Sequence, residues 1–191
     1  MTIWVLLLII QPFLIKLNLR KLHRTIGSVS YVLVPIILIS IFKLLIHNSG
    51  GMKVVDDFSL SFVALVTNAA LAFAILFGLA IWYRKRSDIH ARFMICTVFP
   101  MMTPVTDRLI AHHWRELIPM APTIGGTPIL PFFGFVFSDL LLLGLLIWDW
   151  RSNNRKDVFP VALLIVFLFQ ISVFSLYHFT WWEHFCLWLL N

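Results

Sequence analysis

The stretch SLSFVALVTNAALAFAILFGLAIWY, residues 59–83, runs for 25 residues without a charged side chain. A helix needs about 20 predominantly apolar residues to cross the hydrocarbon core of a bilayer. A membrane β-strand would alternate apolar and polar residues over about ten positions, and this stretch does not alternate. It therefore predicts a membrane-spanning helix.

The whole chain has the same character. Hydrophobic residues make up 60% of it, only 13% is charged, and the mean hydropathy is +0.91. A soluble domain carries about twice that fraction of charge. We therefore expect an all-α fold, a polytopic transmembrane helix bundle that forms a single domain over residues 1–191 and contacts the lipid bilayer.

Apolar runs of suitable length predict about six spans, at 1–18, 26–47, 59–83, 92–113, 129–150 and 158–179. The remaining tail, TWWEHFCLWLLN (180–191), is too short to cross a bilayer. Tryptophan-rich amphipathic helices favour the headgroup layer. The tail therefore predicts an interfacial helix on the outer side.

Eleven of the 15 lysines and arginines fall in three connections: four each in 16–24 and 84–92, and three in 151–156. These connections alternate with two that are acidic or near neutral, 48–57 and 114–128. The positive-inside rule places the basic loops in the cytoplasm, as in a protein of the bacterial inner membrane. The net charge of +6 is thus an orientation signal and does not indicate nucleic acid. Both chain ends then lie outside, which favours a further helix upstream of residue 1.

Polar side chains at membrane depth are the first candidates for a site. They are Asn68 in the third span, Asp107 and Arg108 in the fourth, Asp139 in the fifth and Gln170 in the sixth. An ionisable group at such depth costs several kcal/mol unless it is paired or lines a wet cavity. We expect Arg108 to pair with Asp139.

Two interpretations of that pair stay open. It is either a structural link between helices or part of a charged cavity that opens outward. The Pro- and Gly-rich segment 119–131 would close such a cavity, and Pro100 and Pro104 would kink the fourth span beside it.

Histidines at helix ends are the second set of candidates. Haem b is held by two histidines on neighbouring helices at equal depth. His23 with His90 would meet this condition on the inside. His47 with His112 or His113, or His113 with His178, would meet it outside. The two ends lie about 35 Å apart along a helix, which is shallow for a buried haem.

Other chemistry has weaker support in the sequence. His112, His113 and Glu116 have chelating spacing on a helix, but without further ligands we expect no metal site. The chain has no CxxC, no Gly-rich phosphate loop, no GxSxG and no pair of catalytic carboxylates. Cys96 and Cys186 fall at opposite membrane depths, so we expect both to be free thiols.

Three segments carry a resemblance: KLHRTIGSVSYVL (21–33), DIHARFMICTVFPMMTPVTDR (88–108) and SDLLLLGLLIWDWRSNNRKDVFP (138–160). Together they resemble a family of uncharacterised bacterial integral membrane proteins, which is itself similar to cytochrome-b-like helical proteins. The resemblance implies haem or redox chemistry and an upstream helix with His-x-His. The chain departs from the family pattern at Ala91, where a lysine is usual, and at Phe159, where a histidine is usual.

Three classes of function therefore remain. The first is a membrane protein that binds haem or another redox cofactor between helices. The second is a carrier or sensor of a small ligand with an outward polar cavity. The third is an accessory subunit that joins a larger membrane complex or a homo-oligomer. The sequence does not decide whether the protein is an enzyme.

Overall fold

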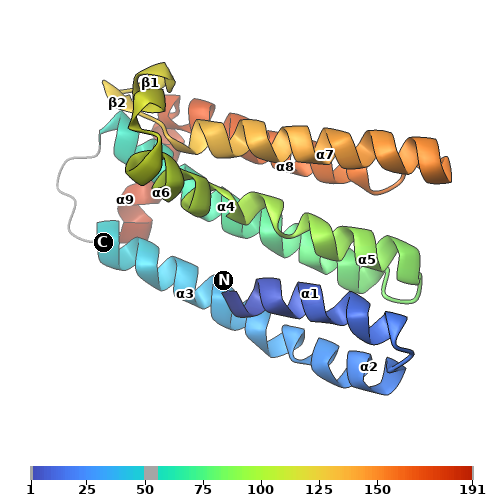
Figure 1. Ribbon diagram of the computed structural model, residues 1–191. Coiled ribbons are helices and arrows are strands. Elements are labelled where there is room, and N and C mark those ends of the chain that lie inside the picture. Colours follow the sequence, from blue (N-terminus) through green and yellow to red (C-terminus); the bar gives the residue numbers. More distant parts are fainter. Residues whose placement is uncertain (1, 50–55, 191) are drawn as a thin grey trace. The chain divides into compact units, whose positions relative to one another are not determined.

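A computed structural model describes residues 2–49 and 56–190 of the chain (Figure 1). By their internal contacts the residues form two compact units, Met1–His47 and Asn48–Asn191. The single domain predicted over residues 1–191 stays a prediction. Each unit is described by itself below.

Unit 1 is a helical hairpin made of α1 (Thr2–Lys16), α2 (Arg20–Ser28) and α3 (Ser30–Ser49). The chain reverses at Asn18, which has a positive φ of 59°, a conformation that asparagine tolerates well. Val29 separates α2 from α3, yet Leu33 N still bonds to Val29 O at 2.9 Å. The stretch Arg20–His47 therefore counts as one helix of 28 residues, long and apolar enough to cross a membrane.

Unit 2 opens with the long helix α4 (Asp57–Trp82), followed by α5 (Ser87–Cys96), the 3-10 turn η1 (Phe99–Met101) and α6 (Thr103–His113). A second 3-10 helix, η2 (Arg115–Met120), and two short strands, β1 (Thr123–Ile124) and β2 (Thr127–Pro128), lead into α7 (Pro131–Asn153). The chain ends with α8 (Phe159–Ser175), η3 (Leu176–His178) and α9 (Thr180–Leu190).

Local sequence signals set several helix ends. The Asp56 carboxylate caps α4 by accepting from Ser59 N at 3.3 Å. Pro131 begins α7, where its missing N–H is not needed. The same helix ends at Asn154, whose φ of 50° is the left-handed conformation that commonly terminates helices.

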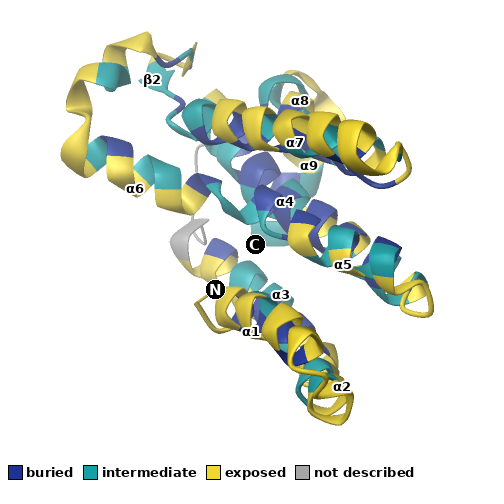
Figure 2. Cartoon of the chain, turned by 45° about the vertical axis from the view of Figure 1, so that its right-hand side comes forward, coloured by how far each residue is buried: buried dark blue, intermediate teal, exposed yellow. Residues whose placement is uncertain are grey.

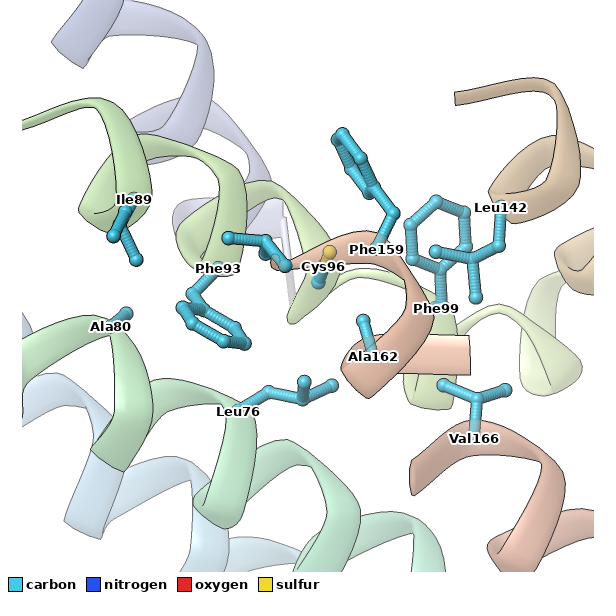
Figure 3. Packing of buried hydrophobic residues seen from close by; sticks show 11 residues of the cluster. Leu76, Ala80, Ile89, Phe93, Cys96, Phe99, Leu142, Phe159, Ala162 and Val166 are labelled. Atoms are coloured by element: carbon cyan, nitrogen blue, oxygen red, sulfur yellow. The ribbon is translucent and has the colours of Figure 1, made fainter. Parts of the chain in front are cut away.

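The most buried helix of unit 2 is α4, whereas α7 carries exposed residues along its length (Figure 2). The helix α4 packs against α5 and α8, and α7 packs against α6 and α8. The main hydrophobic cluster joins α4, α5, η1, α7 and α8 (Figure 3). Its buried members are Leu76, Ala80, Ile89, Phe93, Cys96, Phe99, Leu142, Val158, Phe159, Ala162 and Val166.

The fourth predicted span is broken. Ser87–Met101 and Thr103–His113 meet at an angle of 42°. Pro100 lies in the intervening turn and Pro104 in the first turn of α6, and both remove the backbone donor that would continue the helix. The kink predicted from these prolines is confirmed.

The segment predicted to act as a lid folds against its neighbours. Gly125 and Gly126 form the two-residue turn between β1 and β2 with positive φ values of 57° and 79°, which suits a tight antiparallel hairpin. Ile124 and Ile129 on either side of this turn are buried. Two isoleucines thus anchor the turn, and the role of segment 119–131 as a cover stays a prediction.

The tail forms a helix, as predicted, and that helix docks on α4. The indole N–H of Trp182 donates to Leu60 O at 3.1 Å. Trp182 and Cys186 are buried, whereas Trp181 and Trp188 are exposed. Burial raises the pKa of the Cys186 thiol to about 11, and both cysteines are free, as predicted.

The number of spans is supported in part. Within the described residues, four helices are long and apolar enough to cross a membrane, or five if the bent pair α5–α6 is one span. The first predicted span, 1–18, corresponds to α1, a shorter apolar helix whose 15 residues are fewer than the about 20 that a crossing needs. The structure supports four to five spans, and the sixth stays a prediction.

In unit 2, the helices α6 and α7 approach each other closely at Gly134. A Cβ added to Gly134 of α7 would lie 2.5 Å from Thr106 Oγ1 and 3.1 Å from Thr103 Cα, both on α6. Small residues commonly allow such close approach of helices in membranes. Gly144 on the same helix has nothing within 4 Å of an added Cβ, so it offers a matched control.

We predict that Gly134→Ala lowers the stability of the protein by about 1–3 kcal/mol, because the methyl group forces α6 away from α7. Gly144→Ala should cause no loss. Thermal unfolding of the purified variants in detergent measures both effects. Equal melting temperatures for the two variants would contradict the close packing of α6 on α7.

Candidate functional site

The strongest polar contact in unit 2 is a charge pair between α5 and α7. Arg92 Nε donates to Asp149 Oδ2 at 2.9 Å, and Arg92 Nη2 donates to Asp149 Oδ1 at 2.7 Å. Asn153 Nδ2 also donates to Oδ1 at 2.7 Å, and Arg92 Nη1 donates to Asp88 O at 3.0 Å. The Asp149 side chain is only 2% exposed. This two-pronged geometry is the strong form of an arginine–carboxylate contact.

A second ion pair lies at the same end of unit 2. Arg155, in the α7–α8 loop, donates to the Asp88 carboxylate at the start of α5. The hydrogen bond that Arg155 donates to the Asp88 carboxylate raises the pKa of Arg155 above its usual value. Both side chains are more than a third exposed, so solvent weakens this pair. Lys156 in the same loop stacks over the Trp150 ring at 4.0 Å from its centroid.

Sequence reasoning missed these pairs. Arg155 was assigned only a role in orientation, no partner was predicted for Arg92, and Asp149 was not among the candidates. The available signal was Asp149 itself, an acid at a helix end whose connection is otherwise basic.

His90 has a defined tautomer. Its Nδ1 lies 2.7 Å from Ala80 O, which can only accept, so Nδ1 carries the proton. The other ring nitrogen, Nε2, is then free to accept or to ligate. Metal-bound histidines commonly show this arrangement of the ring.

The Gln11 amide in unit 1 lies beside two backbone groups of α2. Gly27 N–H can only donate and His23 O can only accept. With the amide oriented to match them, its oxygen accepts from Gly27 N at 3.0 Å, and its nitrogen donates to His23 O at 3.2 Å and to His23 Nδ1. His23 as a haem ligand stays a prediction.

The remaining histidine predictions are not tested. His47, His112 and His113 are exposed. His23–His90, and His47 with His112 or His113, take one member from each unit. These pairs stay predictions, as does His113–His178. Within 2–49 and 56–190, no group of three or more His, Cys, Asp or Glu side chains could hold a metal ion.

The predicted pair of Arg108 with Asp139 is not formed. The ion pairs found among the described residues are Arg92–Asp149 and Arg155–Asp88. Asp139 instead accepts a hydrogen bond from Gln170 Nε2 at 2.9 Å. Arg108 is exposed on α6, and Asp107 Oδ1 beside it is buried without a hydrogen-bond partner in the described part of the chain. The prediction was wrong because Gln170 of α8, rather than Arg108, reaches Asp139.

Asp139 and Gln170 open into a groove between α7 and α8. The groove has a volume of about 440 Å³, and its other polar side chain is that of Ser175. The remaining lining is apolar: Phe132, Phe135, Val136, Phe167, Ile171 and Phe174. The groove is thus an aromatic surface with one carboxylate on it.

Asn68, the last candidate, is a contact between helices. Its Nδ2 donates to Ser172 Oγ at 2.8 Å. About two turns earlier on α4, Ser61 Oγ donates to Val173 O, also at 2.8 Å. Both bonds join α4 to α8. Hydrogen bonds of this kind commonly hold membrane helices together, so Asn68 needs no ligand to explain it.

Comparisons with protein-family models, with curated proteins and with solved structures found no match. The motif resemblance to bacterial membrane proteins therefore stays a prediction. The described residues define a class: an all-α chain with four to five helices long and apolar enough to cross a membrane.

Proposed function

We propose that the chain is a polytopic protein of the bacterial inner membrane, with its basic loops in the cytoplasm. The loops that follow α4 and α7 carry basic residues and lie at the same end of unit 2, where Arg155 meets Asp88 (Figure 1). Basic loops gathered at one end of a bundle are typical of the cytoplasmic side.

We propose further that the protein binds a small lipid-soluble ligand in the groove between α7 and α8, as a carrier or sensor would. One observation carries this proposal: Asp139 is a carboxylate at membrane depth that no cationic side chain of the described residues pairs with. It lies eight residues from the start of α7, about 12 Å along the helix.

A purely structural role explains this residue less well. Gln170 bonds to one carboxylate oxygen, and Asp139 Oδ2 makes no bond with the described part of the chain. An unpaired acid in a span costs several kcal/mol, and intramembrane acids usually mark a pathway or a ligand site. The groove volume of about 440 Å³ also falls within the range of small-molecule sites.

We predict that a groove-filling substitution, Val136→Trp, abolishes thermal stabilisation by ligands that stabilise the wild type. The probes are three small aromatic compounds, one neutral, one cationic and one anionic, added to purified protein in detergent. At 100 times its Kd a ligand stabilises by about 2.7 kcal/mol, enough for a clear rise in melting temperature.

Val161→Trp is the matched control. Val161 on α8 is 40% exposed, Val136 is 42% exposed, and only Val136 lines the groove. Wild type and Val161→Trp should respond to at least one probe, and Val136→Trp to none. A response shared by all three proteins, or absent from all three, would refute the ligand site.

Haem b is a second candidate, favoured by the free Nε2 of His90. Its second ligand would come from a histidine at equal depth. The absorption spectrum of the purified, dithionite-reduced protein tests it. A Soret band that His90→Ala removes would support haem, and a spectrum without that band would reject it.

A further inference from the structure

The groove between α7 and α8 combines a free carboxylate oxygen with aromatic walls, and we propose that it selects lipophilic organic cations. This inference rests on the proposed ligand site and states its chemical class. The occupant would be a quaternary ammonium, a phosphonium or a protonated hydrophobic amine.

The charge of the occupant follows from Asp139. Gln170 Nε2 already donates to Oδ1 at 2.9 Å, so Oδ2 is the oxygen left for a ligand. The groove holds no lysine, arginine or histidine, and its other polar groups are Gln170 and Ser175. An anion would therefore meet a carboxylate without any compensating positive charge, whereas a cation would supply the missing partner.

The walls of the groove favour an organic cation. Phe132, Phe135, Phe167 and Phe174 are four of its nine lining residues. The faces of aromatic rings attract cations, most strongly where water is excluded. Phe135 is held in place by edge contacts with Phe169 and Phe174, at centroid distances of 5.4 Å and 6.1 Å.

An inorganic cation fits this groove poorly. Calcium binds six to eight oxygen ligands, and magnesium requires a nearly ideal octahedron. The groove offers one carboxylate, one amide and one hydroxyl. An ion with its own apolar shell needs no such ligand set, and it could enter between the exposed side chains of Val136, Phe167 and Ile171.

The test compares tetraphenylphosphonium with tetraphenylborate, which have nearly the same shape and opposite charge. Binding to the purified full chain in detergent is measured by equilibrium dialysis. Val136→Trp, in which the groove is filled, gives the non-specific background. We expect groove-specific binding of the phosphonium at least tenfold tighter than that of the borate.

Asp139→Asn should reduce phosphonium affinity at least tenfold. The matched control is Asp107→Asn, an acid of α6 that does not line the groove, and it should bind phosphonium as the wild type does. If Asp139→Asn fails to fold, the comparison of the two ions on the wild type still decides. Equal or stronger groove-specific binding of the borate would overturn the inference, and so would a folded Asp139→Asn with unchanged phosphonium affinity.

These results separate the inference from the function on which it rests. If neutral or anionic probes stabilise the wild type but not Val136→Trp, the groove is a ligand site and the cation selectivity is wrong. If no probe of any charge distinguishes wild type from Val136→Trp, both proposals fail together. A second copy of the chain or a partner helix that covers the groove would give this last result.

Discussion

The two-pronged contact between Arg92 and Asp149 is the interaction on which the arrangement of unit 2 depends. The helix α5 packs against α4 and α8, and α7 packs against α6 and α8, so this contact ties α5 directly to α7. Arg92 Nε, Arg92 Nη2 and Asn153 Nδ2 all donate to the carboxylate of Asp149, whose side chain is almost fully buried. Removing Arg92 would leave the buried Asp149 carboxylate without its partner, which costs far more than the net value of the pair.

That contact lies in the first half of the bent fourth span. The helix α5 has only ten residues and is separated from α6 by a turn, so the backbone alone does not fix its direction. The charge pair holds one end of the bent segment, and the close approach of Thr103 to Gly134 holds the other side of the break. Between them, α8 bonds to α4 through Asn68 and to α7 through Gln170.

Much of the helix pattern was predictable, because hydropathy reports length and composition directly. The span predicted at 59–83 corresponds to α4, whose ends differ from the prediction by one or two residues. Pro100 and Pro104 predicted the bend in the fourth span. Partners between helices were not predictable, since hydropathy does not say which helices are neighbours. Asp139 was singled out by its expected depth, and its partner is Gln170 rather than the predicted Arg108. Arg92 and Asp149 were overlooked because each falls at the end of a predicted span, 92–113 or 129–150, where a charge is ordinary.

The most direct measurement is a double-mutant cycle with Arg92→Leu and Asp149→Leu, read as the stability of the purified protein in detergent. We predict that each single variant loses about 3–5 kcal/mol and that the double variant loses much less than the sum. The same cycle at the exposed pair of Asp88 and Arg155 should show far weaker coupling. Losses at Arg92 and Asp149 that simply add would show that this pair does not hold α5 to α7.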